Sequence, residues 1–225
     1  MRLKLTGLIV AAFSFAAAQS AFAADMPVKA PAYAPPVSWT GFYAGLQAGY
    51  GWHDISYSFG TSNTLNMKGF VGGGTVGYNW QAGAFVVGLE SDISFADVKG
   101  SALNVGIAPC SIQGCEAKLN WFSTGRARLG YAIGNLLPYL TGGVALGGVK
   151  GSADNGACGN IPCFYDETRW GWTVGGGLEY RLYGNWSLKA EYLYLNLGKP
   201  SFTSPFVLPT DFAVNIVRGG VNLHF

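Results

Sequence analysis

The sequence predicts an all-β fold, an eight-stranded antiparallel up-and-down transmembrane β-barrel, and three observations support this prediction. Of the 225 residues, 49% are hydrophobic and 15% aromatic, but only 12% are charged, where soluble proteins carry about 25%. The 34 glycines argue against long helices, because each interior Gly costs about 1 kcal/mol relative to Ala. Finally, eight segments alternate between two kinds of side chain with a period of two residues, as strands do.

The N-terminal 23 residues are predicted to be a signal peptide. Arg2 and Lys4 precede an apolar stretch, and small residues stand before a predicted cleavage between Ala23 and Ala24. Removing two of the 14 basic residues leaves 12 against 12 acidic ones, so the mature chain has a formal net charge of zero. Binding to nucleic acid needs a basic patch or stripe, and we expect no nucleic-acid partner.

Residues 24–39 are predicted to form a periplasmic linker ahead of the barrel domain, which covers residues 40–225. The linker contains Pro27, Pro31, Pro35 and Pro36. Proline-rich segments of this kind are extended and do not contribute to a core.

The strands are predicted at about 40–52, 67–80, 85–96, 118–131, 136–149, 168–181, 186–197 and 212–225. With these boundaries the connections hold 14, 4, 21, 4, 18, 4 and 14 residues, so long and short ones alternate. Outer-membrane barrels combine short periplasmic turns with longer extracellular loops. The pattern therefore predicts a barrel in the bacterial outer membrane with four extracellular loops.

The charged residues indicate which face of each strand meets lipid. Alternation alone also fits a soluble lipocalin-type barrel with an apolar interior. In 186–197, however, Lys189 and Glu191 share one face, while Trp186, Leu188 and Tyr192 share the other. On a soluble barrel this aromatic face would form a larger apolar patch than water tolerates. We therefore expect the aromatic face outside, in lipid, where closure of the barrel pairs every backbone polar group.

The opposite face predicts a charged interior of four acids and five bases. The residues are Glu90, Asp92, Arg126, Arg128, Glu179, Arg181, Lys189, Glu191 and Arg218. Charges enclosed together should be paired, because an unpartnered one costs several kcal/mol. This predicts a lumen plugged by ion pairs, since the interior of an eight-stranded barrel is filled by side chains. A gated ion path through the same charges is the alternative.

The four cysteines form two equally spaced pairs, Cys110 with Cys115 and Cys158 with Cys163. An even number of cysteines in an exported chain favours disulfides, although four cysteines allow three connectivities. We expect two local bridges. A four-thiolate metal site is the alternative, but zinc motifs have shorter spacing, so no metal is expected.

The two histidines do not support an enzyme. His53 would open the first extracellular loop, whereas His224 falls at the periplasmic end of the last strand. Strands of this length separate them by more than about 20 Å, so they cannot share a catalytic site, and we expect no catalytic residues and no cofactor. The alternative is a surface haem site in which His53, Tyr57 or Tyr165 offers an axial ligand. The simpler interpretation is that His53 is solvated at a strand end.

Four segments resemble a known family. They are Trp39-Thr-Gly-Phe-Tyr-Ala-Gly45, Leu136-Leu-Pro-Tyr-Leu-Thr-Gly-Gly143, Trp186-Ser-Leu-Lys-Ala-Glu-Tyr-Leu-Tyr194 and Arg218-Gly-Gly-Val-Asn-Leu-His-Phe225. They are similar to the small alphaproteobacterial outer-membrane barrels called major outer-membrane or haemin-binding proteins. The resemblance implies a surface protein that supports envelope integrity, with haem binding or weak porin activity in some members.

The resemblance also suggests partners. Phe225 ends the last predicted strand and looks like the signal that the bacterial barrel-assembly machinery recognises. The other expected partners are outer-membrane lipid and lipopolysaccharide, with peptidoglycan as a candidate contact of the linker. We therefore expect a structural barrel that displays its loops, and the alternatives are a small porin-like channel and a surface haemin-binding protein.

Overall fold

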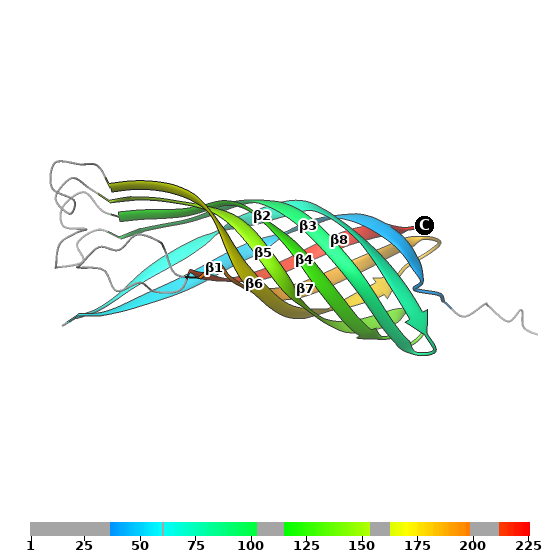
Figure 1. Ribbon diagram of the computed structural model, residues 1–225. Helices are drawn as coiled ribbons and strands as arrows, with labels where there is room; N and C mark the ends of the chain where they lie inside the picture. The colour runs from blue at the N-terminus through cyan, green and yellow to red at the C-terminus, as the bar shows by residue number, and fades with distance from the viewer. Residues whose placement is uncertain (1–36, 60, 103–114, 154–162, 199–211) are drawn as a thin grey trace, which may run out of the picture. The chain divides into compact units, whose positions relative to one another are not determined.

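The computed structural model describes residues 37–59, 61–102, 115–153, 163–198 and 212–225. Its eight strands are β1 (Gly41–Phe59), β2 (Thr61–Ala82), β3 (Phe85–Ala102), β4 (Cys115–Tyr131), β5 (Leu136–Ala153), β6 (Cys163–Arg181), β7 (Trp186–Asn196) and β8 (Ala213–His224). Each strand pairs with its neighbours in the sequence, and β8 pairs antiparallel with β1 to close the barrel (Figure 1). The predicted fold class is confirmed. Among the described residues, no helix is long and apolar enough to cross a membrane.

The predicted first loop at 53–66 is wrong. β1 continues to Phe59 and β2 begins at Thr61, with a continuous antiparallel register from Trp52↔Lys68 to Phe59↔Thr61. The segment is rich in Ser, Thr and Asn, a composition that is typical of loops. A hairpin can nevertheless continue through it, because strand pairing beyond the lipid needs no uniformly apolar face.

The opposite end of the barrel has the predicted short turns. β2 is joined to β3 by two residues, and β4–β5 and β6–β7 by four each. Each turn contains a glycine with a positive φ angle: Gly83 at 64°, Gly134 at 59° and Gly184 at 65°. This left-handed backbone is strained for residues with a Cβ atom and open to Gly. These glycines explain why the strands reverse so sharply here.

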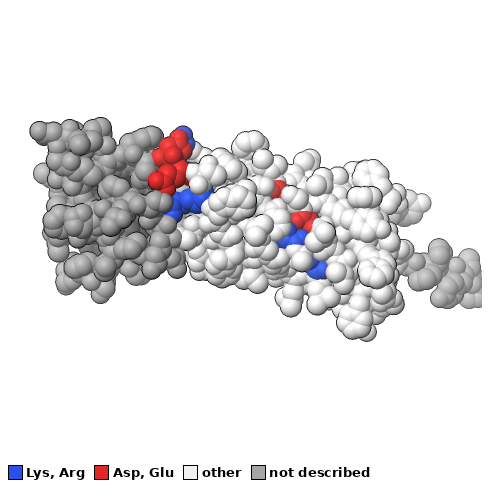
Figure 2. Space-filling model, viewed as in Figure 1, with Lys and Arg blue, Asp and Glu red and all other residues white. Residues whose placement is uncertain are grey.

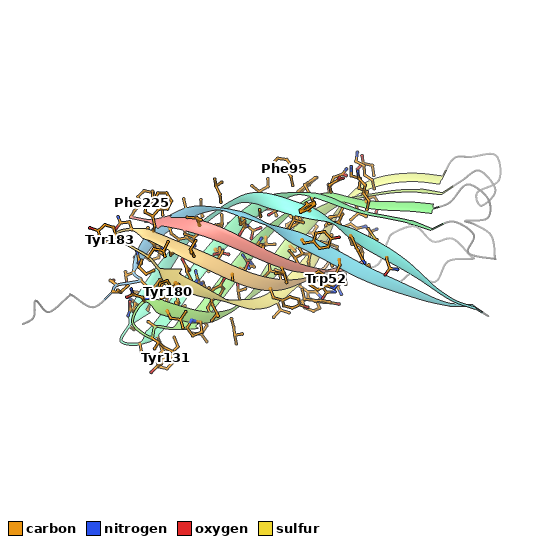
Figure 3. The ribbon with its side chains drawn as sticks, turned by 180° about the vertical axis from the view of Figure 1, so that it is seen from behind. Trp52, Phe95, Tyr131, Tyr180, Tyr183 and Phe225 are labelled. Atoms are coloured by element: carbon orange, nitrogen blue, oxygen red, sulfur yellow. The ribbon has the colours of Figure 1, made fainter. Side chains whose placement is uncertain are left out.

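Bulky apolar side chains cover the outside of the barrel, as predicted. Leu46, Phe70 and Phe95 are each about three-quarters exposed, and in β7 exposed and buried residues alternate from Trp186 to Leu193. In Figure 3 the labelled outward aromatic residues mark two levels of the wall: Tyr131, Tyr180, Tyr183 and Phe225 lie at the turn end, and Trp52 and Phe95 lie about midway between the turns and the loops. Two such girdles flank the apolar band of outer-membrane barrels.

The interior is filled at three levels. A mouth cluster at the turn end consists of Trp39, Val86 and Leu137. A charged layer follows, made of Glu90, Asp92, Arg126, Arg128, Glu179, Lys189, Glu191 and Arg218. An apolar layer fills the loop-side half with Met67, Val71, Ala96, Val98, Leu119, Phe122, Ala145, Val149, Leu193, Leu195, Leu197, Phe212, Val214 and Ile216. The sequence predicted the charged layer but not the apolar one.

Candidate functional site

The charged layer brings together eight of the nine predicted interior charges, from β3, β4, β6, β7 and β8. Each of these residues is at most 3% exposed. Four are carboxylates and four are cations, so the layer is balanced in charge. Burial of this kind requires compensation, because an isolated charge in a medium of low polarity costs several kcal/mol.

Arg126 lies at the centre of the network. Its guanidinium bonds Glu90, the Asp92 Oδ2 atom at 2.9 Å and the Glu191 Oε1 atom at 3.0 Å. Arg218 lies across the lumen and contacts Asp92 at 3.1 Å and Glu191 at 2.6 Å. Two guanidinium groups therefore share two carboxylates, which fixes all four side chains in one arrangement.

Two tyrosines extend the network toward the turn end. The Tyr43 hydroxyl donates to Glu90 Oε2 at 2.7 Å, and the Tyr139 hydroxyl donates to Glu191 Oε1 at 2.9 Å. The Arg128 guanidinium lies 3.8 Å from the centre of the Tyr139 ring and bonds Glu179. This stacking adds a cation–π interaction to the ion pair.

Inward glycines make room for these tyrosine rings. A Cβ atom on Gly77 would lie 2.4 Å from the Tyr43 ring, and one on Gly177 would lie 2.7 Å from the Tyr139 hydroxyl oxygen. Both distances are shorter than any normal contact. The Gly175–Gly177 run, like Gly72–Gly74, lies inside a strand, where glycine permits close approach.

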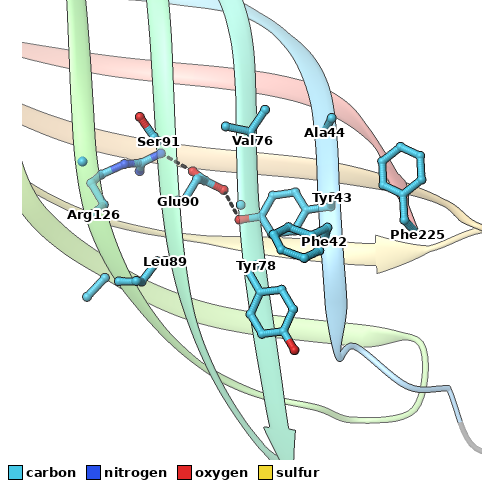
Figure 4. A pocket seen from close by; sticks show the side chains of 13 residues that line it. Phe42, Tyr43, Ala44, Val76, Tyr78, Leu89, Glu90, Ser91, Arg126 and Phe225 are labelled. Carbon is cyan, nitrogen blue, oxygen red and sulfur yellow. Dashed lines mark hydrogen bonds and ion pairs between the residues drawn. The ribbon is translucent and has the colours of Figure 1, made fainter.

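A hollow of about 680 Å³ marks the lipid-facing wall beside the network. Phe42, Tyr78 and Phe225 surround it, and Glu90 with its bonds to Tyr43 and Arg126 lies behind it (Figure 4). The outward residues Ala44, Ser91 and Ala127 are small, which makes the wall thin here. The hollow faces lipid and its rim is apolar, so it brings no additional chemical groups to the network.

Arg181 was predicted to belong to the charged interior, but it does not join the charged layer. It lies at the mouth of the barrel, where its guanidinium donates to the Ser38 carbonyl at 2.7 Å and lies 5.0 Å from the centre of the Trp39 ring. Trp39 is completely buried, although the sequence assigned it to the linker. Its backbone N–H donates to Gln81 Oε1 at 2.8 Å. The end of the predicted linker therefore helps to fill the mouth.

The comparisons with known proteins agree with this geometry. The family model described as "Outer membrane protein beta-barrel domain" matches residues 8–225. The chain belongs to this family. It is therefore a protein of the bacterial outer membrane, as predicted.

Two relatives and one solved structure illustrate the similarity. A 31 kDa outer-membrane immunogenic protein of Brucella melitensis is 38% identical, over 98% of this chain and 100% of the relative. A 22 kDa outer membrane protein of Rhizobium leguminosarum is 34% identical, over 86% of this chain and 85% of the relative. The crystal structure of Neisserial surface protein A is 20% identical, with a TM-score of 0.46, over 83% of this chain and 98% of that one.

In this family member His224 belongs to a cluster that the sequence analysis missed. Its Nε2 atom lies 2.9 Å from Ser187 Oγ and 3.1 Å from Glu179 Oε1. A catalytic triad needs the carboxylate and the hydroxyl on different ring nitrogens, whereas here one nitrogen meets both. Glu179 also accepts a hydrogen bond from Asn222 at 2.8 Å. The cluster therefore anchors a buried carboxylate. Its sequence signal was parity, because Ser187 shares the inner face of β7 with Lys189, and Asn222 and His224 share that of β8 with Arg218.

His53 does not lie at a solvated strand end, so that expectation is wrong. It lies within β1, is only 8% exposed and packs against Phe212, with 5.9 Å between the ring centres. The continuation of β1 beyond Trp52 explains this burial. Tyr57 and Tyr165, the other haem candidates, lie in β1 and β6, but their side chains are outside the described set. Among the described residues, no group of three or more His, Cys, Asp or Glu could hold a metal ion.

The cysteine prediction falls mostly outside the described residues, as does the cleavage between Ala23 and Ala24. Cys110 and Cys158 are not described, but the backbones of Cys115 and Cys163 are, in β4 and β6. Both pair with Ala153 of β5, so two strand spacings of about 4.8 Å separate their Cα atoms. A disulfide spans at most about 7 Å between Cα atoms. A bond from Cys115 to Cys163 is therefore excluded, while the two local bridges remain a prediction.

Proposed function

We propose that the protein is a structural outer-membrane barrel that supports envelope integrity, displays extracellular loops and does not conduct ions. The observation that carries this proposal is the charged layer, in which four carboxylates and four cations fill the lumen and are at most 3% exposed. An ion that crossed this layer would have to break bonds such as those of Arg126 to Glu90, Asp92 and Glu191. Interiors of eight-stranded barrels are generally packed in this way.

The apolar layer supports the same proposal independently. Phe122, Leu193 and Leu195 are at most 1% exposed, and they fill the loop-side half of the lumen together with eleven other apolar residues. A hydrated ion gains nothing in such surroundings and loses its water. The lumen is thus closed by charge compensation at one level and by apolar packing at the next.

Planar-bilayer recording tests the proposal. We expect no steady conductance from the purified wild-type protein. The variant Phe122→Ala/Arg126→Ala opens both layers and should leak, whereas Leu188→Ala removes a half-exposed outer side chain and should remain silent. Steady, reproducible conductance from the wild-type protein would show that the lumen is a pore and would favour the porin-like alternative. The haemin alternative gains no support from His53, because its ring is buried against Phe212.

A further inference from the structure

Four lysines lie directly opposite one another on neighbouring strands. Lys68 of β2 pairs with Lys99 of β3, Lys99 pairs with Lys118 of β4, and Lys118 pairs with Lys150 of β5. We call these residues the lysine row. With strands about 4.8 Å apart, the row covers about 14 Å of the barrel wall.

The lysine row faces outward. Each lysine is adjacent in sequence to a residue that is buried in the apolar layer, and these neighbours are Met67, Val98, Leu119 and Val149. Because successive side chains of a strand point to opposite faces, the four lysines share the outer face. The side chains of Lys99, Lys118 and Lys150 are 57%, 40% and 43% exposed, respectively, and Lys68 is exposed as well. These ammonium groups are therefore available to a ligand.

Among the described side chains, carboxylates neutralise the row only in part. Asp97 Oδ1 lies 2.9 Å from Lys99 Nζ and 3.1 Å from Lys118 Nζ, and Asp166 Oδ2 lies 2.6 Å from Lys150 Nζ. Among the described ion pairs, these two carboxylates are the ones that face the four lysines. Like charges directly opposite one another destabilise a sheet. The row is thus an unfavourable arrangement that an anionic ligand would relieve.

The position of the row indicates where such a ligand would be. Phe70 and Phe95 lie two and four residues from Lys68 and Lys99 on the same outer face and are 77% and 74% exposed. Phe95 lies with Trp52 at the level of outward aromatic residues farther from the turns (Figure 3), and the aromatic girdles of outer-membrane barrels lie at the level of the lipid headgroups. The row therefore lies at the headgroups of the outer leaflet. Figure 2 shows acidic and basic atoms together at the loop end of the described surface, with a few more charged atoms nearer the turn end of an otherwise uncharged wall.

The row is confined to one side of the barrel. On β1 the residue opposite Lys68 is Trp52, which in turn faces Asn215 of β8, and Asn215 faces Tyr194 of β7. None of these three side chains is charged. Nonspecific attraction to an anionic surface would not need a one-sided row, whereas a ligand that carries several negative groups on a compact headgroup would.

We propose that the lysine row binds the phosphorylated disaccharide headgroup of lipopolysaccharide in the outer leaflet. Lysine binds phosphate as a point charge with three donors, and two phosphates on one disaccharide match several ammonium groups spaced along about 14 Å of wall. The acyl chains of the same molecule would lie against Phe70 and Phe95. The proposal rests on the outer-membrane location and does not depend on the closed lumen.

Binding of purified lipopolysaccharide tests this proposal. The full-length mature protein is refolded in neutral detergent micelles and titrated with a rough lipopolysaccharide that carries both phosphates. The variant K68Q/K99Q/K118Q/K150Q should bind at least about tenfold more weakly, since each lysine near an anionic surface contributes about 1 kcal/mol. The matched variant D97N/D166N removes the opposing carboxylates and should bind more tightly than the wild type.

Two further ligands distinguish the sources of negative charge. Lipopolysaccharide stripped of its phosphates should bind the wild type and the glutamine variant equally weakly. Micelles that contain phosphatidylglycerol should compete poorly, and equal binding to them would overturn the assignment to lipopolysaccharide. An affinity of the fourfold variant within twofold of the wild type would overturn the site itself. Heat-modifiable gel migration verifies folding, and if the fourfold variant does not fold, K99Q and K118Q singly should each weaken binding about fivefold.

Discussion

The charged layer and the apolar layer fill the same tube in different ways. In the charged layer a few side chains make directed bonds. The single side chain of Arg126, for example, contacts three carboxylates, those of Glu90, Asp92 and Glu191. In the apolar layer fourteen residues pack without any such bonds between their side chains. The first arrangement depends on which atoms are present, whereas the second depends mainly on volume. The two layers should therefore respond differently to substitutions of similar size.

The largest effect is expected for Arg126→Met, which keeps most of the volume and removes the charge. Glu90, Asp92 and Glu191 would then share fewer cations inside the barrel. Removing one partner of a buried ion pair costs about 3–5 kcal/mol, and we expect the free energy of unfolding to fall by that amount. Urea unfolding in lipid vesicles, followed by tryptophan fluorescence, measures it. Arg126→Lys keeps the charge and should lose less, and a loss below about 1 kcal/mol for Arg126→Met would contradict the comparison.

An intermediate effect is expected for Gly77→Ala, which tests how closely the charged layer is packed. The new Cβ atom would lie 2.4 Å from the Tyr43 ring and would push the hydroxyl away from Glu90. Overpacking of this kind costs about 1–3 kcal/mol. Gly72→Ala is the matched control in the same strand, because its nearest neighbour, the Gln47 carbonyl oxygen, would be 3.6 Å away. Equal unfolding midpoints for the two variants would show that Tyr43 is not held in place as the structure indicates.

The smallest effect is expected for Leu193→Met in the apolar layer. Leu193 is completely buried, but the replacement conserves volume and polarity, and such exchanges usually cost less than about 1.5 kcal/mol. The same urea experiment measures this value next to Arg126→Met. A loss as large as that of the arginine variant would mean that the apolar layer is as exacting as the charged one, and the contrast between the layers would disappear.

The same contrast explains what could be predicted from the sequence. The strand 186–197 alternates clearly from Trp186 to Glu191, and this parity predicted Lys189 and Glu191 inside. Beyond Glu191 the inward residues Leu193 and Leu195 alternate with the outward residues Tyr192 and Tyr194. Both faces are then apolar or aromatic, so the period of two disappears and the apolar layer could not be recognised.

Parity also does not specify how deep a side chain lies along the barrel. Arg181 shares the inner face with Glu179, as predicted, yet it lies at the mouth against Trp39, because two residues along a strand move a side chain by about 6.6 Å. His53 was misplaced for a related reason. The polar composition after Trp52 concealed the continuation of β1, and with it the burial of the His53 ring.

The closure of the barrel by β8 has a consequence for biogenesis. β8 supplies Arg218, which contacts Asp92 of β3 and Glu191 of β7. A partly formed sheet that lacks this last strand holds all four carboxylates of the charged layer but only three of its cations. Sealing the sheet and neutralising its contents are therefore a single event, which disfavours incomplete intermediates in lipid and makes assembly cooperative.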